Sequence, residues 1–186
     1  MTTAGARLDH DAIAARIPHA GPMCLLDQAV SWDESRIECT AFARPPRHPD
    51  AAARSGPEAS VAAHPLAQDG RLPATAAIEY AAQAMALHGR LLQEGATDAA
   101  PTRGFLAGLR SVRLHCRWIA EESPPLTIRV TRFAGDDVQV LYDFEVRAAG
   151  PIAQGRAVVI LDAVSRAKAA MIPAAIASAL SRLLPA

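Results

Sequence analysis

One acidic residue, Glu79, lies in a stretch of sequence that is otherwise small or apolar. It is the only charged residue between Ala74 and Leu87. Thr75 and Gln83 lie four residues to either side, so in a helix all three side chains share one face. That face could be a narrow polar stripe toward solvent. It could instead hold a carboxyl group at the edge of a buried apolar pocket, where desolvation would raise its pKa and suit a general acid.

A histidine precedes this stretch in the sequence. His64 stands before Pro65, in an irregular segment ahead of the expected helix. One histidine of six in a loop is weak evidence by itself. Paired with Glu79, however, it could supply the base and the acid for proton abstraction and leaving-group protonation. We also expect the backbone N–H groups of Ala74 and Thr75, at the start of the helix, to be free to hold a carbonyl oxygen.

Hydrophobic periodicity predicts the elements that position these residues. A helix is expected over 73–93, because proline suits its first turn and Gly95 lies just past its end. It is apolar all round, so it should be buried. A shorter helix is expected over 9–17, capped by Asp9. Short turns separate the strand-like runs, which should therefore pair antiparallel: 23–32, 36–42, 111–118, 126–133, 138–146 and 157–161.

The order of these elements predicts one α+β domain over residues 1–186. Two strands precede the long helix and four follow it, so alternating β–α units and a doubly wound parallel sheet are disfavoured. A curved antiparallel sheet of about six strands around the helix would bury it. Segment 44–70 lacks periodicity and is expected to be a long irregular loop. The alanine-rich tail, 171–186, is expected to be helical.

Composition excludes several classes of function. Lys+Arg and Asp+Glu are both 19, which argues against a nucleic-acid binder. The first twenty residues contain no apolar run of signal-peptide length, and no stretch of the chain approaches the length of a membrane span, so we expect no membrane insertion; reduced cysteines would fit a cytoplasmic protein. Three cysteines, Cys24, Cys39 and Cys116, lack metal-ligand spacing and are expected to be reduced and buried. No metal or other cofactor is expected.

Three segments together resemble a known family. They are 17–27, Ile-Pro-His-Ala-Gly-Pro-Met-Cys-Leu-Leu-Asp; 64–83, with His64-Pro65 and Ile78-Glu79-Tyr80; and 104–114, which begins Gly-Phe-Leu-Ala-Gly-Leu. In this order they resemble the hot-dog 3-hydroxyacyl-ACP dehydratases. The phrase around Glu79 is most similar to the dehydratase-like branch linked to aryl-polyene and xanthomonadin-type pigment synthesis.

The resemblance implies a hot-dog fold and a dehydratase of 3-hydroxyacyl chains on acyl carrier protein, in fatty-acid-like or polyene pigment synthesis. His64 would take the α-proton, Glu79 would protonate the departing hydroxyl, and Gln83 would orient Glu79 or add a hydrogen bond. In the family these groups come from two subunits, so a homodimer or a heterodimer with a related hot-dog subunit is implied. His19 would serve a turn and packing role, and Asp27 a structural one.

The same resemblance implies a carrier-binding surface. Arg110, Arg113 and Arg117 follow the Phe-Leu-Ala-Gly stretch, where related dehydratases present basic residues to the acidic carrier. Ordinary solvated strand faces remain an equal interpretation, and Arg113 and Arg117 are expected on the same face of one strand.

Two other functions stay open on sequence grounds. One is a hot-dog acyl thioesterase, in which Glu79 activates water. The other is a non-catalytic hot-dog subunit that shapes the interface of an active partner. This possibility depends on His64, whose spacing to Glu79 is one residue longer than is usual in the family.

Overall fold

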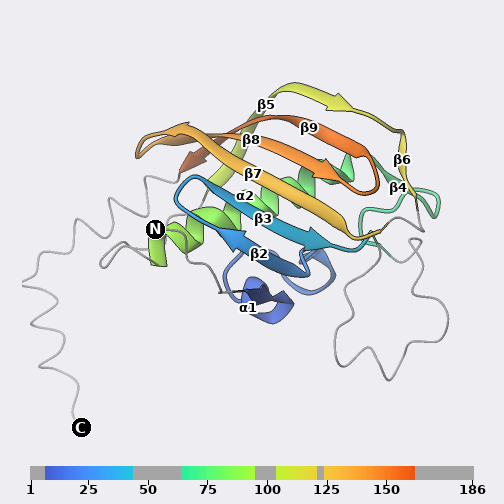
Figure 1. The fold of residues 1–186 in the computed structure, drawn as a ribbon, viewed down its shortest axis with the longest axis horizontal. Coiled ribbons are helices and arrows are strands. Elements are labelled where there is room, and N and C mark those ends of the chain that lie inside the picture. The colour runs from blue at the N-terminus through green and yellow to red at the C-terminus, as the bar shows by residue number, and fades with distance from the viewer. Residues whose placement is uncertain (1–6, 44–63, 95–103, 121–123, 162–186) are drawn as a thin grey trace, which may run out of the picture.

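The computed structural model describes residues 7–43, 64–94, 104–120 and 124–161 (Figure 1). The predicted tail helix and most of the predicted 44–70 loop lie outside these residues. The chain order of the elements is β1 (Leu8–Asp9), α1 (His10–Ala14), a 3₁₀ turn (Gly21–Met23), β2 (Gln28–Trp32), β3 (Arg36–Ala41), β4 (Leu72–Pro73), α2 (Ala76–Glu94), β5 (Gly104–Leu114), β6 (Trp118–Ile119), β7 (Leu126–Gly135), β8 (Gln139–Arg147) and β9 (Pro151–Leu161).

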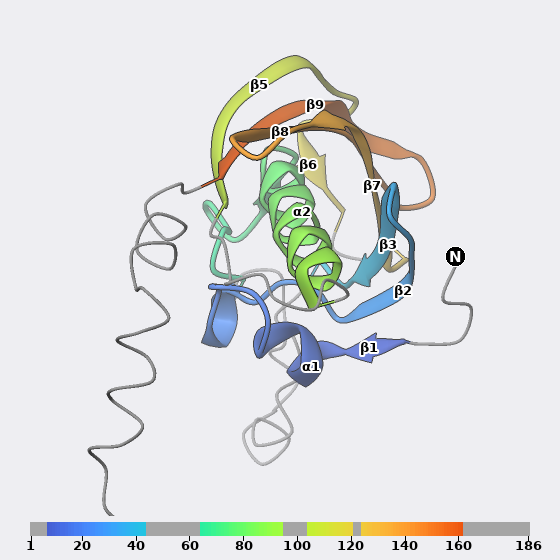
Figure 2. The same cartoon turned by 90° about the vertical axis from the view of Figure 1, so that its left-hand side faces the viewer.

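Seven strands form one antiparallel sheet in the order β1-β2-β3-β7-β8-β9-β5, and β4 and β6 form a separate two-stranded pair. Figure 2 looks along α2 and shows the large sheet curling around the helix. This is the α+β hot-dog architecture that the sequence predicted. The sheet has one strand more than the expected six, because the two-residue β1 pairs with β2.

The helix is buried because its sequence is small and apolar on most sides. Tyr80, Leu87 and four alanines of α2 are among its buried residues. The sheet supplies the opposing apolar surface by strand alternation. In β8, for example, every second side chain faces inward: Val140, Tyr142, Phe144 and Val146. Burying such side chains contributes about 2 kcal/mol each toward folding, which fixes the position of the helix inside the sheet.

Several predicted boundaries were wrong for local backbone reasons. The run 23–32 contains a 3₁₀ turn that ends at Met23, and β2 begins only at Gln28; Gly21, in this turn, has a φ of 57°. Only residues 111–114 of the predicted strand 111–118 are in β5, which begins at Gly104 and ends at Leu114, and Trp118 begins β6. Ser111 has a φ of 52° and a bulge interrupts the register beside it, so the strand is irregular at this point.

Other expectations can be compared directly. The Asp9 side chain accepts a hydrogen bond from the Ala12 N–H at 2.9 Å, so the predicted cap of α1 is confirmed. Cys24 and Cys39 are buried, Cys116 is half-buried, and all three are free thiols. The Asp27 carboxylate accepts from the Phe42 N–H at 2.7 Å, a contact that fits the structural role expected for it. No helix in the described ranges is long and apolar enough to cross a membrane.

Candidate functional site

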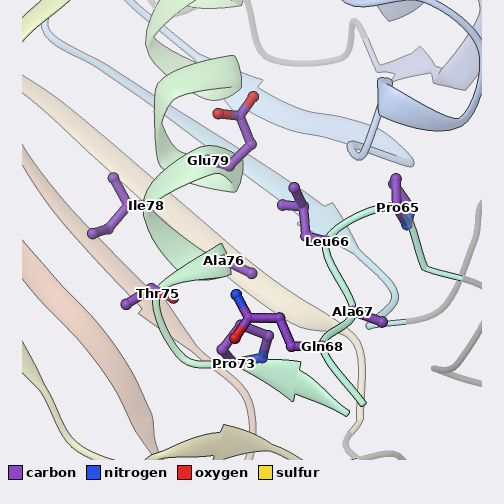
Figure 3. Close-up of a pocket in the computed structure, with 9 residues that line it drawn as sticks. All are labelled: Pro65, Leu66, Ala67, Gln68, Pro73, Thr75, Ala76, Ile78 and Glu79. Carbon is purple, nitrogen blue, oxygen red and sulfur yellow. The ribbon is translucent and has the colours of Figure 1, made fainter. Parts of the chain in front are cut away.

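A pocket of about 450 Å³ lies between the start of α2 and the loop that follows residue 63. Figure 3 shows Glu79 at one end of this pocket and Thr75 near the other, with Leu66 on the loop side between them. The lining combines backbone and apolar side chains with a few polar groups, a composition typical of ligand sites. Its residues are Pro65, Leu66, Ala67, Gln68, Pro73, Thr75, Ala76, Ile78 and Glu79.

The carboxylate of Glu79 is held on one side only. His19 Nε2 lies 3.1 Å from its Oε1, and the Gln83 side-chain amide donates to the same oxygen at 3.0 Å. Glu79 retains 32% side-chain exposure, which keeps it accessible from the pocket. The hydrogen bond from His19 is the main cause that lowers the pKa of Glu79, and it outweighs the opposing effect of burial. The expected rise in this pKa was therefore wrong, because no sequence pattern connects Glu79 with its donor His19.

Gln83 is fixed by backbone groups of the 3₁₀ region. The Leu25 N–H donates to its side-chain oxygen at 2.8 Å, and its amide donates to the Met23 carbonyl at 2.7 Å. Gln83 is fully buried, whereas Glu79 is partly exposed and Thr75 is exposed, so the polar face meets solvent at Thr75 and Glu79 but not at Gln83. Its fixed amide can orient Glu79 without moving.

His64 has a different environment from the one expected of a free base. It is 3% exposed, and its Nε2 lies 2.9 Å from the Tyr80 hydroxyl, which itself donates to the Phe42 carbonyl. The Leu66 N–H donates to His64 Nδ1 at 3.1 Å. Since Nδ1 accepts, Nε2 must carry the proton and donate to Tyr80. Burial lowers the pKa of His64 to about 4, so the ring is neutral at pH 7.

These contacts make His64 an anchor for the loop that forms one wall of the pocket. It joins this loop to α2 through Tyr80, and the hydrogen bond from Tyr80 to Phe42 continues the connection to the end of β3. Within the described chain, no hydrogen bond links His64 to Glu79. The catalytic assignment of His64 thus remains a prediction, and it requires that at least one of these contacts be broken.

The start of α2 differs from the expectation in one respect. Ala74 is buried, and its N–H donates to the Arg117 carbonyl at 3.0 Å. This donor is consequently occupied and cannot hold a substrate oxygen, as the sequence had suggested. Thr75 lies on the pocket surface. The helix begins at Ala76 and not at the predicted residue 73, so Thr75 belongs to the turn that leads into it.

The predicted carrier-binding arginines are exposed, but they do not share one strand face. Arg110 and Arg113 belong to β5, whereas Arg117 lies beyond its end, in the bend before β6. Arg110 stands opposite Arg156 of β9 in the sheet. None of the ion pairs between described residues involves the three predicted arginines.

Two residues of this region were missed or misjudged from sequence. His19 was expected to serve a turn, yet it contacts Glu79 from 60 positions earlier in the chain. Tyr80 was noted only as part of a motif, although it is the partner of His64. Its place beside Glu79 on a buried helix was the only available signal. No group of three or more potential metal ligands occurs among the residues that the structure describes.

Comparisons with known proteins agree with the architecture. Residues 11–169 match the family model for the ApeP dehydratase, described as ApeP-like. The dehydratase heterocomplex ApeI:P from Xenorhabdus doucetiae matches with 25% identity and a TM-score of 0.64, covering 80% of this chain and 89% of that one. A mutant thioesterase from Pseudomonas aeruginosa matches with 12% identity and a TM-score of 0.43, covering 70% and 76%. None of the curated proteins matches the chain.

Proposed function

Because the chain belongs to the ApeP-like dehydratase family, we propose that it removes water from 3-hydroxyacyl thioesters to give trans-2-enoyl thioesters. The acyl chain would be carried on acyl carrier protein, in fatty-acid-like or polyene pigment synthesis. The observation that carries this proposal is the Glu79 carboxyl group, which faces a pocket from the first turn of a buried helix and has one oxygen held by His19 and Gln83.

The geometry suits an elimination. Loss of water requires that a proton leave C2 and that a proton reach the C3 hydroxyl. At least one group that can transfer protons, such as a carboxyl group, must therefore lie close to both atoms. The apolar lining from Leu66, Ala76 and Ile78 would accept the acyl chain beside Glu79. Thr75 lies on the same surface and would contact the thioester end.

One observation favours a second candidate, a hot-dog subunit whose own histidine is not catalytic. Both ring nitrogens of His64 are engaged inside the chain, so the base of a two-residue mechanism would have to come from a partner. The solved relative from Xenorhabdus doucetiae is a heterocomplex, which supports a related hot-dog subunit as that partner.

A dehydration assay separates these two functions. The purified chain is given a 3-hydroxyacyl thioester on acyl carrier protein, alone and together with a related hot-dog subunit, and formation of the conjugated enoyl thioester is followed. Turnover by the chain alone supports the dehydratase. Turnover only in the mixture, which is lost in the Glu79→Gln chain, supports a shared site whose base comes from the partner. Turnover only in the mixture, which survives in the Glu79→Gln chain, supports a fully non-catalytic subunit. No turnover in any combination contradicts both.

The edge strand β5 supports a dimer. Leu106 and Leu109 stand opposite Val159 and Ala157 of β9, which face the core, yet they remain 43% and 38% exposed. Their side chains therefore face inward at a sheet edge with little cover. Natural edge strands are usually short or charged, whereas β5 has 11 residues and is apolar before Arg110. We expect the β5 edge to pair with a second hot-dog subunit.

Leu109→Asp is expected to abolish this assembly, because a carboxylate would be buried at the new interface. Light scattering should give the wild type twice the chain mass of 19.6 kDa, or the summed mass with a related subunit, and the variant the mass of one chain. Phe133→Asp, at an exposed position of β7, is the matched control and should leave assembly unchanged. A wild type that stays monomeric alone and with the partner contradicts the dimer.

Exchange of Arg113 and Arg117 for glutamate is expected to weaken binding of acyl carrier protein by about tenfold or more, because both guanidinium groups are exposed and would face its acidic surface. Salt should weaken wild-type binding in the same direction. Titration calorimetry measures both effects, with Arg7→Glu near the opposite edge of the sheet as the control. Equal affinity of the double variant and the wild type would make these arginines ordinary surface residues.

A further inference from the structure

The face of the sheet that turns away from α2 carries apolar side chains. Figure 2 shows α2 on the concave side of β8, β9 and β5, so side chains that alternate with the core residues of these strands point outward. In β9, Ala157 is buried and Val159 packs against the core. Val158 and Ile160 therefore lie on the outer face, where Ile160 is 45% exposed.

Neighbouring strands extend these two residues into a larger surface. Phe105 of β5 stands opposite Ile160 in the sheet register, and Leu141 of β8 stands opposite Val158. Residues that stand opposite each other in a sheet share one face, so all four side chains point outward. Phe105 is 58% exposed.

Phe133 of β7 completes this surface. Its ring centroid lies 4.6 Å from the guanidinium carbon of Arg156, which precedes buried Ala157 in β9 and so also faces outward. Phe133 is 61% exposed. Clusters of exposed large apolar side chains mark interaction sites on proteins. The five residues, which we name the outer patch, are Phe105, Phe133, Leu141, Val158 and Ile160.

The chain continues from this patch into a segment with a matching pattern. β9 ends at Leu161, and residues 174–184 follow between Pro173 and Pro185. These residues lie outside the described ranges, and the pattern is one of sequence alone. In a helix, the large apolar residues of 174–184 would share one face, and its serines and its arginine would lie on the opposite face. The apolar residues are Ile176, Leu180, Leu183 and Leu184, and the polar ones are Ser178, Ser181 and Arg182.

We propose that residues 174–184 form an amphipathic helix whose apolar face docks on the outer patch of the same chain. An isolated helix of this length is marginal in water, so it requires an apolar surface to cover its stripe. The exposed side chains of the outer patch supply such a surface. The inference is independent of the proposed dehydratase function and holds whether or not the chain removes water from a thioester.

The covalent connection favours the patch of the same chain over other surfaces. The Leu161 N–H donates to the Val138 carbonyl at 2.8 Å, which fixes the start of the segment beside the patch residue Ile160. An extended residue spans about 3.3 Å, so segment 162–175 is long enough for the helix to reach the whole patch. A short tether also gives an effective concentration on the order of millimolar.

The polar face of the helix argues against a membrane surface as its binding site. Helices that lie on membranes carry many lysines and arginines on the polar face. Residues 174–184 contain a single cationic residue, Arg182. An uncharged apolar surface such as the outer patch suits this helix better than an anionic lipid surface does.

Hydrogen exchange of the full chain, followed by mass spectrometry, tests whether the helix docks. We expect the amides of 174–184 to exchange about tenfold or more slowly than in a free peptide of that sequence. Leu180→Asp and Phe133→Asp should each remove this protection, because either carboxylate would be buried in the contact. Ser178→Asp, on the polar face, is the matched control and should keep it.

Three results of this experiment overturn the inference. The first is a wild type without protection in 174–184, and the second is protection that appears only with anionic lipid vesicles. The third is an equal response of Leu180→Asp and Ser178→Asp, or protection that survives in Phe133→Asp.

A spin label distinguishes the same chain from a second copy. Ser181→Cys carries the label on the polar face, in a chain with Cys116→Ser, because Cys24 and Cys39 are buried. Docking within one chain should broaden the NMR signals of Phe105 and Ile160 in the labelled chain itself. Broadening that appears only in an unlabelled chain mixed with the labelled one would place the helix on a second copy and overturn the inference, as would broadening in neither chain.

Discussion

Glu79→Gln is expected to lower the rate of dehydration by about a hundredfold or more, the usual loss when a group that transfers protons in the reaction is removed. The amide keeps the shape of the side chain and can still accept from His19 and Gln83 through its oxygen. It can neither give up nor take up the proton that the carboxyl group would transfer. The change should therefore lower kcat far more than it alters KM, because substrate contacts elsewhere in the pocket are preserved.

Two comparisons sharpen this result. Glu34→Gln makes the same chemical change at an exposed turn between β2 and β3 and should leave turnover unchanged. His64→Gln tests the second group of the expected pair. If His64 is the base, its loss should be as damaging as that of Glu79. If it only anchors the loop, the variant should retain most of its kcat. An active enzyme that tolerates Glu79→Gln contradicts the site proposed here.

The second large effect concerns stability at acid pH. Burial lowers the pKa of His64 from 6.5 to about 4. Between these values the unfolded chain binds a proton that the folded chain excludes, so the free energy of unfolding must fall as the pH falls. A pKa difference of about 2.5 corresponds to a loss of about 3 kcal/mol over this range. Below pH 4 this contribution is absent, and above pH 6.5 it is fully present.

Urea unfolding at pH 7, 6, 5 and 4.5 measures this dependence. His64→Gln removes the titrating ring, and we expect its stability to fall less steeply with acidification than that of the wild type. His88 is also buried with a lowered pKa, so some dependence should remain in the variant. His115→Gln, on the surface, should follow the wild-type curve. Parallel curves for wild type and His64→Gln would show that the ring does not titrate as its burial requires.

The contacts of His64 explain why one of these predictions concerns activity and the other concerns stability. His64 is tied to Tyr80 and Leu66 inside the protein, whereas Glu79 opens onto the pocket. Removal of His64 should therefore act mainly on stability and on the wall of the pocket. Removal of the Glu79 carboxylate should act mainly on proton transfer.

The sequence by itself determined the architecture and singled out Glu79 as the candidate carboxyl group. An apolar helix needs cover on all sides, and antiparallel strands separated by short turns can provide it, so the sheet around α2 followed from the periodicity and the order of the elements. Glu79 was conspicuous because a single charged side chain in an apolar helix is costly to bury unless it has hydrogen-bonding partners or a functional role. Gln83 followed from its spacing of four residues on the same helical face.

Only the tertiary structure decided the ionisation of these groups and the contacts that control it. His19 meets Glu79 across 60 residues, and His64 meets Tyr80 from a loop without periodicity. Neither contact has a sequence signal, because folding rather than spacing brings the partners together. The pKa of a carboxyl group depends on its donors as well as its burial. Burial was foreseeable from the apolar helix, whereas the donor was not, and in this protein the donor lowers the pKa of Glu79.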